Sequence, residues 1–228
     1  MTVVPAPSQP ARQGKGRSRS RLKILAAAKA LFLQDGYDGV NLDRIATQAE
    51  VARQTVYNQF GSKEAVFRAV MEHHWSSLPL GDLLTRLEQS LGTDADPAGF
   101  LRQFSEILLT FIEDADQVAF TRLVIAESRR SPWVAEEFYR VGKEPLTKTL
   151  AGCLQRLHET GGIDCPAPEL AAHQFLGLVQ EFIIWPKVMA IGPDVMSIPP
   201  FDVVVEEGIA MFLSRYGVCD EARAARTV

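Results

Sequence analysis

The side chains best suited to specific recognition lie together in one short polar segment. It contains Arg53, Gln54, Thr55, Tyr57 and Asn58. An arginine offers five N–H donors in a fork, an amide offers a donor and an acceptor, and a hydroxyl can act as either. Only one of the five side chains is charged, so their shared property is directional hydrogen bonding rather than proton transfer.

The arrangements that usually carry catalysis or metal binding are missing from the sequence. The four histidines and three cysteines show no metal-ligand spacing, and there is no Gly-rich phosphate loop or nucleophile–base pair. We therefore expect no enzyme, no cofactor and no metal site.

Length and composition favour a globular protein. The chain has 228 residues, 46% of them hydrophobic, and can form one large or two small domains. No segment approaches the ~18 uninterrupted apolar residues of a membrane span, and the start lacks the apolar stretch of a secretory signal. Cys153, Cys165 and Cys219 include no CxxC pair, which fits a reducing compartment. We expect a cytoplasmic protein.

Charge is distributed unevenly along the chain. Residues 1–72 hold eleven Lys and Arg against six Asp and Glu, whereas the whole chain has a net charge of -4. This asymmetry suggests that the first third meets a polyanion, although ordinary surface charge is the alternative. Residues 1–18 are rich in Pro, Gln, Gly and Ser and are predicted to be a disordered basic arm. Such an arm can follow phosphates or enter a minor groove, or it is only a solvated tail.

Two short helices must position the polar segment. A helical pattern from about Ser20 stops at Gly36, and Asn41 is expected to cap a helix over residues 42–48. After a turn at 49–51, the polar segment forms a helix over 53–59, and Ser62 caps a fourth helix.

The contact between these helices is also predictable. Ile45, Val51 and Val56 would form a small shared core, and Ala46 is small enough for close approach. This pattern is typical of a helix-turn-helix, whose second helix projects into the DNA major groove.

The remainder of the chain is helical in pattern, so we expect an all-α fold. The segments are 63–78, 82–91, 97–113, 117–129, 132–142, 145–160, 167–190 and 201–216. Pro145 should break or kink the run from 132 to 160. The β-branched cluster at 203–205 falls within a helical stripe, and we interpret it as helix.

Two parts of the sequence resemble a known family. The stretch Asn41–Val70, NLDRIATQAEVARQTVYNQFGSKEAVFRAV, and the preceding LKILAAAKALFLQDGYDGV resemble the DNA-binding domain of TetR-family regulators over Ser20–Val70. The later segments LVIAESRRSPWVAEEFYR and PELAAHQFLGLVQEFI are similar to the AefR-like subgroup of C-terminal domains.

The resemblance implies DNA-contacting roles for eight positions. These are Asn41, Arg44, Arg53, Gln54, Thr55, Tyr57, Asn58 and Lys63. Arg53, Gln54 and Thr55 match base-reading positions, with Arg53 suited to guanine and Gln54 to adenine. Asn41, Tyr57, Asn58 and Lys63 match backbone contacts, and Arg44 can reach a phosphate or a base edge. The alternatives are a half-buried aromatic for Tyr57, a helix-start cation for Lys63 and a solvated side chain for Arg44.

The chain departs from the family pattern at two positions. Glu50 stands where the family's turn normally has Gly, at a position expected near the left-handed region, which costs roughly 1 kcal/mol. Ala52 stands where a capping Ser is usual, which forfeits about 1 kcal/mol.

The resemblance also implies a domain layout and partners. We expect a disordered arm (1–18), a DNA-binding domain (19–75), a helical ligand-binding and dimerisation domain (76–217) and a tail (218–228). The family implies a homodimer on a palindromic operator, formed by helices 167–190 and 201–216 as a four-helix bundle. The apolar stripes of these helices are Ala171, Ala172, Phe175, Val179 and Phe182, with Gly177 between them, and Phe201, Val204, Val205, Gly208, Ile209 and Phe212. Alternatively, both stripes face only an intramolecular core.

A small-molecule effector site is the least specified feature. Candidate apolar lining residues are Phe104, Leu108, Phe111, Leu123, Phe138, Phe175 and Phe182, and candidate polar contacts are Arg122, His173, Gln180 and Glu181. For each of them the alternative is a plain core or surface residue. We expect a ligand-responsive repressor; the alternatives are an activator or ligand-independent regulator of the same fold, or a helical enzyme or interaction module with a vestigial helix-turn-helix.

Overall fold

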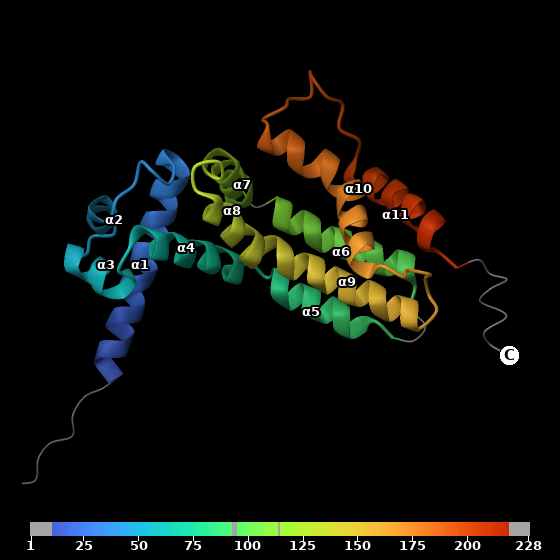
Figure 1. Ribbon diagram of the computed structural model, residues 1–228, viewed down its shortest axis with the longest axis horizontal. Coiled ribbons are helices and arrows are strands. Elements are labelled where there is room, and N and C mark those ends of the chain that lie inside the picture. The colour runs from blue at the N-terminus through green and yellow to red at the C-terminus, as the bar shows by residue number, and fades with distance from the viewer. Residues whose placement is uncertain (1–10, 93–94, 114, 219–228) are drawn as a thin grey trace, which may run out of the picture. The chain divides into compact units, whose positions relative to one another are not determined.

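The computed structural model describes residues 11–92, 95–113 and 115–218. It divides into two compact units, the first ending at His74 and the second beginning at Trp75. In the described ranges the regular structure is helical, with a single isolated bridge between Ile163 and Gly217 (Figure 1). No helix in these ranges is both long enough and apolar enough to cross a membrane. The all-α prediction is confirmed.

The first unit contains three helices and most of a fourth. They are α1 (Ala11–Asp35), α2 (Leu42–Gln48), α3 (Arg53–Phe60) and α4 (Lys63–Ser77). The Asn41 side chain accepts a hydrogen bond from the Arg44 N–H at 2.9 Å, and the Ser62 hydroxyl accepts one from the Ala65 N–H at 3.1 Å. Both predicted caps are therefore confirmed, and Gly36 ends α1 at a φ of 73°.

The start of α1 differs from the prediction. We expected a disordered arm through residue 18 and a helix from about Ser20, but the helix begins at Ala11. Once a helix is nucleated, each added residue gains a backbone hydrogen bond at little further cost, so a helix can extend into a polar segment. Residues 1–10 of the predicted arm lie outside the described residues.

The second unit contains the remaining helices. They are α5 (Leu80–Ser90), α6 (Pro97–Ile112), α7 (Ala115–Glu127), α8 (Pro132–Phe138), the π-helical turn η1 (Tyr139–Lys143), α9 (Glu144–Glu159), α10 (Pro168–Val188) and α11 (Phe201–Tyr216). Prolines at the first helical position begin α8 and α10. Residues 203–205 are helical, which confirms that interpretation.

We expected Pro145 to break or kink the run from 132 to 160, and the helix is disturbed there without being broken. The chain stays helical, and the turn before the proline widens into η1, where the Glu144 N–H bonds to the Tyr139 carbonyl five residues earlier. A proline lacks an N–H and crowds the carbonyl four residues before it, and a wider turn relieves that crowding.

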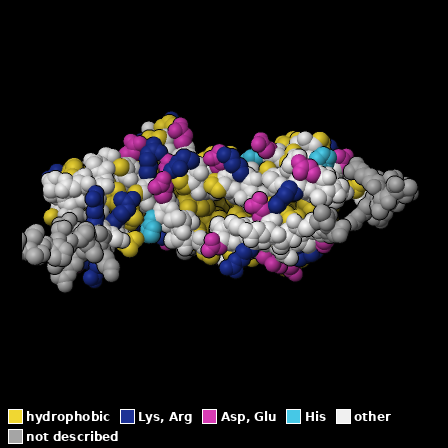
Figure 2. Space-filling view, turned by 90° about the horizontal axis from the view of Figure 1, so that it is seen from below, with side chains coloured by type: hydrophobic (Ala, Val, Ile, Leu, Met, Phe, Trp, Pro, Cys, Tyr) yellow, Lys and Arg dark blue, Asp and Glu magenta, His cyan; other side chains and the backbone are white. Residues whose placement is uncertain are grey.

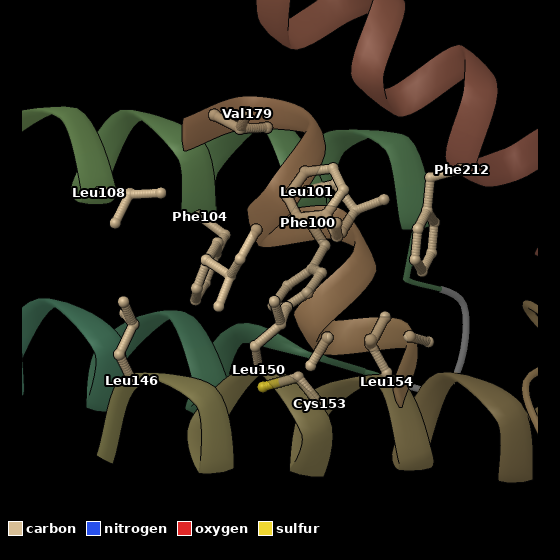
Figure 3. Close-up of a cluster of buried hydrophobic side chains, with 14 of the residues drawn as sticks. Phe100, Leu101, Phe104, Leu108, Leu146, Leu150, Cys153, Leu154, Val179 and Phe212 are labelled. Atoms are coloured by element: carbon tan, nitrogen blue, oxygen red, sulfur yellow. The ribbon is translucent and has the colours of Figure 1, made fainter. Parts of the chain in front are cut away.

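One continuous core holds the second unit together. Phe104 and Leu108 of α6 point toward Leu146 and Leu150 of α9, and Val179 of α10 lies beside them (Figure 3). All five side chains are less than 5% exposed. This core fixes the helices that carry the candidate effector and dimer residues.

The residues of α10 that we expected at a dimer interface face the core of their own chain instead. Ala171, Ala172, Phe175 and Val179 are completely buried within one chain, and only Phe182 is half-buried. Most of the predicted α11 stripe is also buried within one chain, namely Val204, Val205, Gly208, Ile209 and Phe212. The intramolecular alternative therefore holds, because periodicity identifies an apolar stripe without showing what it packs against.

Candidate nucleic-acid interface

A small buried core fixes α3 against α2. Ile45 and Val56 are fully buried and Ala46 is 4% exposed, whereas Val51 is partly exposed. The Val51 N–H donates to the Ala46 carbonyl at 3.0 Å and closes the turn between the helices. The shared core predicted from sequence is therefore present.

The turn contains the two departures from the family pattern. Glu50 has a φ of 54°, so a non-glycine residue occupies the left-handed region as expected. Ala52 precedes α3 without a side-chain cap. The Nζ atom of Lys23 lies 3.5 Å from the Glu50 carboxylate, so a cation of α1 partly offsets the charge that Glu50 adds beside α3.

The exposed face of α3 presents two ordered pairs of polar side chains. Arg53 donates to the Tyr57 hydroxyl at 3.3 Å, and the Gln54 amide donates to the Asn58 side-chain oxygen at 2.8 Å. Each pair is separated by four residues, so both lie along one side of the helix. Thr55, between them in sequence, is partly buried.

A carboxylate on α2 completes the arrangement around Arg53. The Arg53 Nε atom lies 2.6 Å from an Asp43 carboxylate oxygen. The hydrogen bond to Tyr57 and then the charge of Asp43 raise the pKa of the Arg53 guanidinium above its ordinary value. Arg53 is therefore a cation whose position is set by two neighbours.

Arg44 is engaged within its own chain. Its guanidinium donates to the Gly39 carbonyl at 2.6 Å and pairs with Asp35 at 2.5 Å. These contacts tie the start of α2 to the end of α1. The arrangement favours a positioning role for Arg44.

Lys63 is also held by a neighbour. Its ammonium donates to the Tyr37 carbonyl at 2.9 Å and lies 4.2 Å from the centre of the Tyr37 ring. The ring in turn packs edge-on against Phe67 at a centroid distance of 5.4 Å. An ammonium has three N–H donors, so Lys63 can contact a phosphate while keeping this hydrogen bond.

Helix α1 braces the far end of α3. The Gln59 amide donates to the Ser20 hydroxyl at 2.8 Å, and the Arg21 guanidinium lies 4.6 Å from the centre of the Phe60 ring. Arg17 and Arg19 are exposed one turn earlier. The described part of the basic segment thus belongs to a helix anchored on the recognition helix.

Sequence reasoning missed the partners of these side chains. Asp35, Tyr37 and Asp43 each hold a residue that the sequence placed in the interface, and Lys23 pairs with Glu50 of the turn. The pairing of Asp43 with Arg53 could have been suspected from the sequence. Asp43 lies in the first turn of the first predicted helix of the motif, and Arg53 begins the second. The other three contacts depend on how α1 crosses the later helices, which periodicity does not specify.

The candidate effector residues are distributed over the core and the surface of the second unit. Phe104, Leu108, Phe111, Leu123 and Phe175 are buried. Phe138 and Gln180 are half-buried, Phe182 lies half-buried at a groove between α10 and α11, and His173 and Glu181 are exposed.

Arg122 has a specific structural role in the second unit. It donates to the Lys187 and Val188 carbonyls at 2.6 and 2.8 Å and so caps the end of α10. Arg122 thus contributes to the packing of the second unit through the end of α10.

Other potential ligand sites give no signal in the described residues. No group of three His, Cys, Asp or Glu side chains there is placed to hold a metal ion. Cys153 and Cys165 are buried free thiols, whereas Cys219 and most of the predicted C-terminal tail lie outside the described residues. On the face that Figure 2 shows, acidic and basic side chains of the second unit are interspersed, unlike a surface built for a polyanion.

Models of two domain families match the chain. Residues 24–70 match the bacterial regulatory proteins of the tetR family, and residues 99–218 match the C-terminal domain of AefR-like transcriptional repressors. The chain belongs to the TetR family. Its members are transcription regulators with an N-terminal helix-turn-helix and are not enzymes, which confirms both the family and the functional class expected from the sequence.

Individual TetR-family proteins resemble this chain over different lengths. The transcriptional activator FasR of Mycolicibacterium smegmatis is 32% identical over 101 residues, or 44% of each chain. The transcriptional repressor NicS of Pseudomonas putida is 35% identical over 96 residues, or 42% of this chain and 41% of NicS. The matched parts thus span less than half of these two relatives.

A solved structure extends the TetR-family likeness to most of the chain. The flavonoid-responsive regulator FrrA is 28% identical, covers 88% of this chain and 98% of its own, and superposes with a TM-score of 0.70. The fold of most of the chain is therefore shared with FrrA.

Proposed function

We propose that this TetR-family protein controls transcription by binding operator DNA through α3. The observation that carries the proposal is the two side-chain hydrogen bonds, Arg53–Tyr57 and Gln54–Asn58, on the exposed face of α3. Side chains already held in one orientation lose little freedom when they meet a base pair. The buried contact between α2 and α3 supports the proposal because it fixes the orientation of α3, which carries these side chains.

The contacts divide into sequence reading and backbone positioning. Gln54 reads adenine and Arg53 reads guanine in the major groove, with Thr55 beside them. Tyr57, Asn58, Asn41 and Lys63 contact phosphates, and the cations of α1 add affinity that does not depend on sequence. Arg44 positions α2 through Asp35 and Gly39.

The protein acts as a homodimer through α10 and α11. These helices expose a set of large apolar side chains on one chain, which are Leu170, Trp185, Met189, Val203 and Met211, between 41% and 58% exposed. A groove of about 620 Å³ among Leu178, Phe182 and Met211 leaves room for a partner helix. Several large apolar side chains exposed on the same pair of helices favour an interface, and a two-fold dimer suits a palindromic operator.

The second unit responds to a largely apolar small molecule. Support comes from the aromatic-rich core around Phe104 and Phe175 and from FrrA, which is named as flavonoid-responsive. Because the core is closed, an effector must select a conformer in which α6, α9 and α10 have separated. Repression is the favoured direction, since the matching C-terminal family is that of AefR-like repressors, while FasR is an activator.

Fluorescence anisotropy with the DNA upstream of the protein's own gene tests the DNA-binding proposal. Gln54→Ala and Arg53→Ala should lower the preference for this DNA over random DNA by about 1–3 kcal/mol each. Gln103→Ala and Arg129→Ala, exposed in the second unit, are matched controls that should change nothing. If all four variants discriminate as the native chain does, α3 does not read the operator.

A thermal-shift and anisotropy assay with a flavonoid panel tests the effector proposal. A flavonoid that binds should raise the melting temperature and change operator affinity. If no flavonoid in the panel causes either effect, the proposal of a flavonoid-like effector fails. The DNA-binding proposal would be unaffected by that result.

A further inference from the structure

The loop between α10 and α11 exposes large apolar side chains. Val195 is 81% exposed and Ile198 46% exposed, and Met189 at the start of the loop is 58% exposed. In Figure 1 the loop stands out from the ends of the two helices.

The loop is nevertheless ordered by its own backbone. Ile191 donates its N–H to the Pro186 carbonyl at 2.9 Å, and Val195 donates to the Gly192 carbonyl at 3.0 Å. Pro199 and Pro200 stiffen the return to α11, where the Pro200 carbonyl accepts the Val204 N–H at 3.1 Å. Its apolar side chains are therefore held outward by a defined backbone.

The loop continues the exposed apolar face of α10 and α11. Trp185 precedes it on α10, Met189 begins it, and Val203 follows it on α11. The same face is the proposed homodimer interface, and the role of the loop rests on that proposed homodimer.

A second groove lies at the opposite end of α10. It has a volume of about 620 Å³ between the middle of α9 and the start of α10, with Ala151, Gly152 and Pro168 on its walls and Leu170 at its edge. Leu170 is 56% exposed and also belongs to the apolar face, so groove and face are continuous. A Cβ atom on Gly152 would have no other atom within 4 Å, so the groove is open at that residue.

Two-fold symmetry brings these features together. In an isologous dimer every contact occurs twice, once in each direction. Where the two-fold axis is perpendicular to α10, the two copies of α10 run antiparallel, and one end of α10 meets the opposite end of its partner. The middle of α10 lies near Gly177, which is exposed and has no atom within 4 Å of an added Cβ. An axis crossing there places the loop after Val188 of one copy beside the groove at Pro168 of the other.

We propose that residues 189–200 form an arm that docks on a second copy of this chain. Val195 and Ile198 of one copy occupy the groove between α9 and α10 of the other, next to its Leu170. The polar side chains of Lys148, Gln155 and Glu169 surround this apolar contact as a rim. Each dimer contains the contact twice.

Sedimentation velocity on a dilution series of the full chain tests the arm. Val195→Asp/Ile198→Asp should raise the dimer dissociation constant at least tenfold, and Gly152→Phe, on the groove side, should do the same. Ile125→Asp is the control, because Ile125 is 52% exposed on α7 and belongs to neither feature.

A cross-linking experiment shows whether the contact joins two chains. A chain with Ile198→Cys, mixed with one carrying Gly152→Cys and oxidised, should give a heterodimeric disulfide that an Ile125→Cys chain does not give. Unchanged dissociation constants together with no cross-link would overturn the arm and leave the homodimer standing. A native chain that sediments as a monomer at every concentration would instead overturn the homodimer, and the arm with it.

Discussion

The recognition residues are held by contacts that cost little to release. Arg53 and Asp43 pair at 2.6 Å, but their side chains are 64% and 52% exposed. Exposed ion pairs contribute about 0–1 kcal/mol, so Arg53 can exchange Asp43 for a guanine edge with a small loss. The surrounding contacts therefore orient the Arg53 side chain and still allow it to exchange partners.

Glu50→Gly should stabilise the protein. The φ of 54° at Glu50 costs a non-glycine residue about 1 kcal/mol, and its ion pair with Lys23 is too exposed to offset that cost. We expect the melting temperature to rise by roughly 2–4 °C. Glu50→Ala is the control, because it removes the same charge and keeps the strain. Equal melting temperatures for the two variants would show that the backbone conformation is not what limits stability.

Arg44→Ala should weaken the fold rather than the phosphate contacts. It removes the bonds to Asp35 and Gly39, and we expect a loss of about 1 kcal/mol in unfolding free energy. A double-mutant cycle with Asp35→Asn should give a coupling of about 0.2–1 kcal/mol. The slope of log affinity against log salt should stay at the native value. A slope that falls by about 1 would instead identify Arg44 as a phosphate contact.

At the scale of elements, local signals predicted most of the helices. Asn41 marked the start of α2, and Pro132 and Pro168 stand at the starts of α8 and α10, because capping and proline placement depend only on neighbouring residues. The turn at Tyr139–Lys143 was not predictable in the same way. A proline signals that a helix is disturbed, while the tertiary neighbours decide whether it breaks, bends or widens.

Those neighbours form a socket around Trp75. Its ring lies 4.6 Å from the Phe111 ring and 5.9 Å from the Phe138 ring, measured between centroids. Gly142, in the π-helical turn, closes the socket, since an added Cβ would lie 2.1 Å from the Trp75 ring. The widened turn thus brings the one residue without a side chain against the indole.

Gly142→Ala should destabilise the second unit by about 1–3 kcal/mol in urea unfolding, because the methyl group overpacks the socket. Tryptophan fluorescence should shift as the Trp75 ring is displaced. Gly81→Ala is the matched control: it lies in α5 with no atom within 4 Å of an added Cβ, so it should be neutral or slightly stabilising. A Gly142→Ala protein as stable as this control would mean that the socket is loosely packed.

At the scale of the molecule, the sequence identified the helices of the proposed dimer but not their contact face. Helix α10 is apolar on two sides, with Phe175 and Val179 inside and Trp185 and Met189 outside. Both sides repeat with helical spacing, so only the tertiary packing separates them. The contact of Arg122 with Val188, 66 residues apart, likewise has no local signal. The recognition helix was predictable because its function depends on a contiguous segment, whereas an interface or pocket combines distant ones.

The two-fold arrangement makes a geometric prediction about the operator. One rigid dimer holds its two α3 helices at a fixed separation, so it reads half-sites whose centres lie about 34–36 Å apart on one side of the duplex. Inserting ~5 base pairs between the half-sites turns one of them to the opposite side, since a helical turn has about 10–10.5 base pairs. We expect affinity in a gel-shift titration to fall to that for a single half-site. The same insertion placed outside the palindrome is the control and should have no effect. Full affinity for the interrupted palindrome would mean that the half-sites are bound independently, and the proposal of a single dimer reading both would fail.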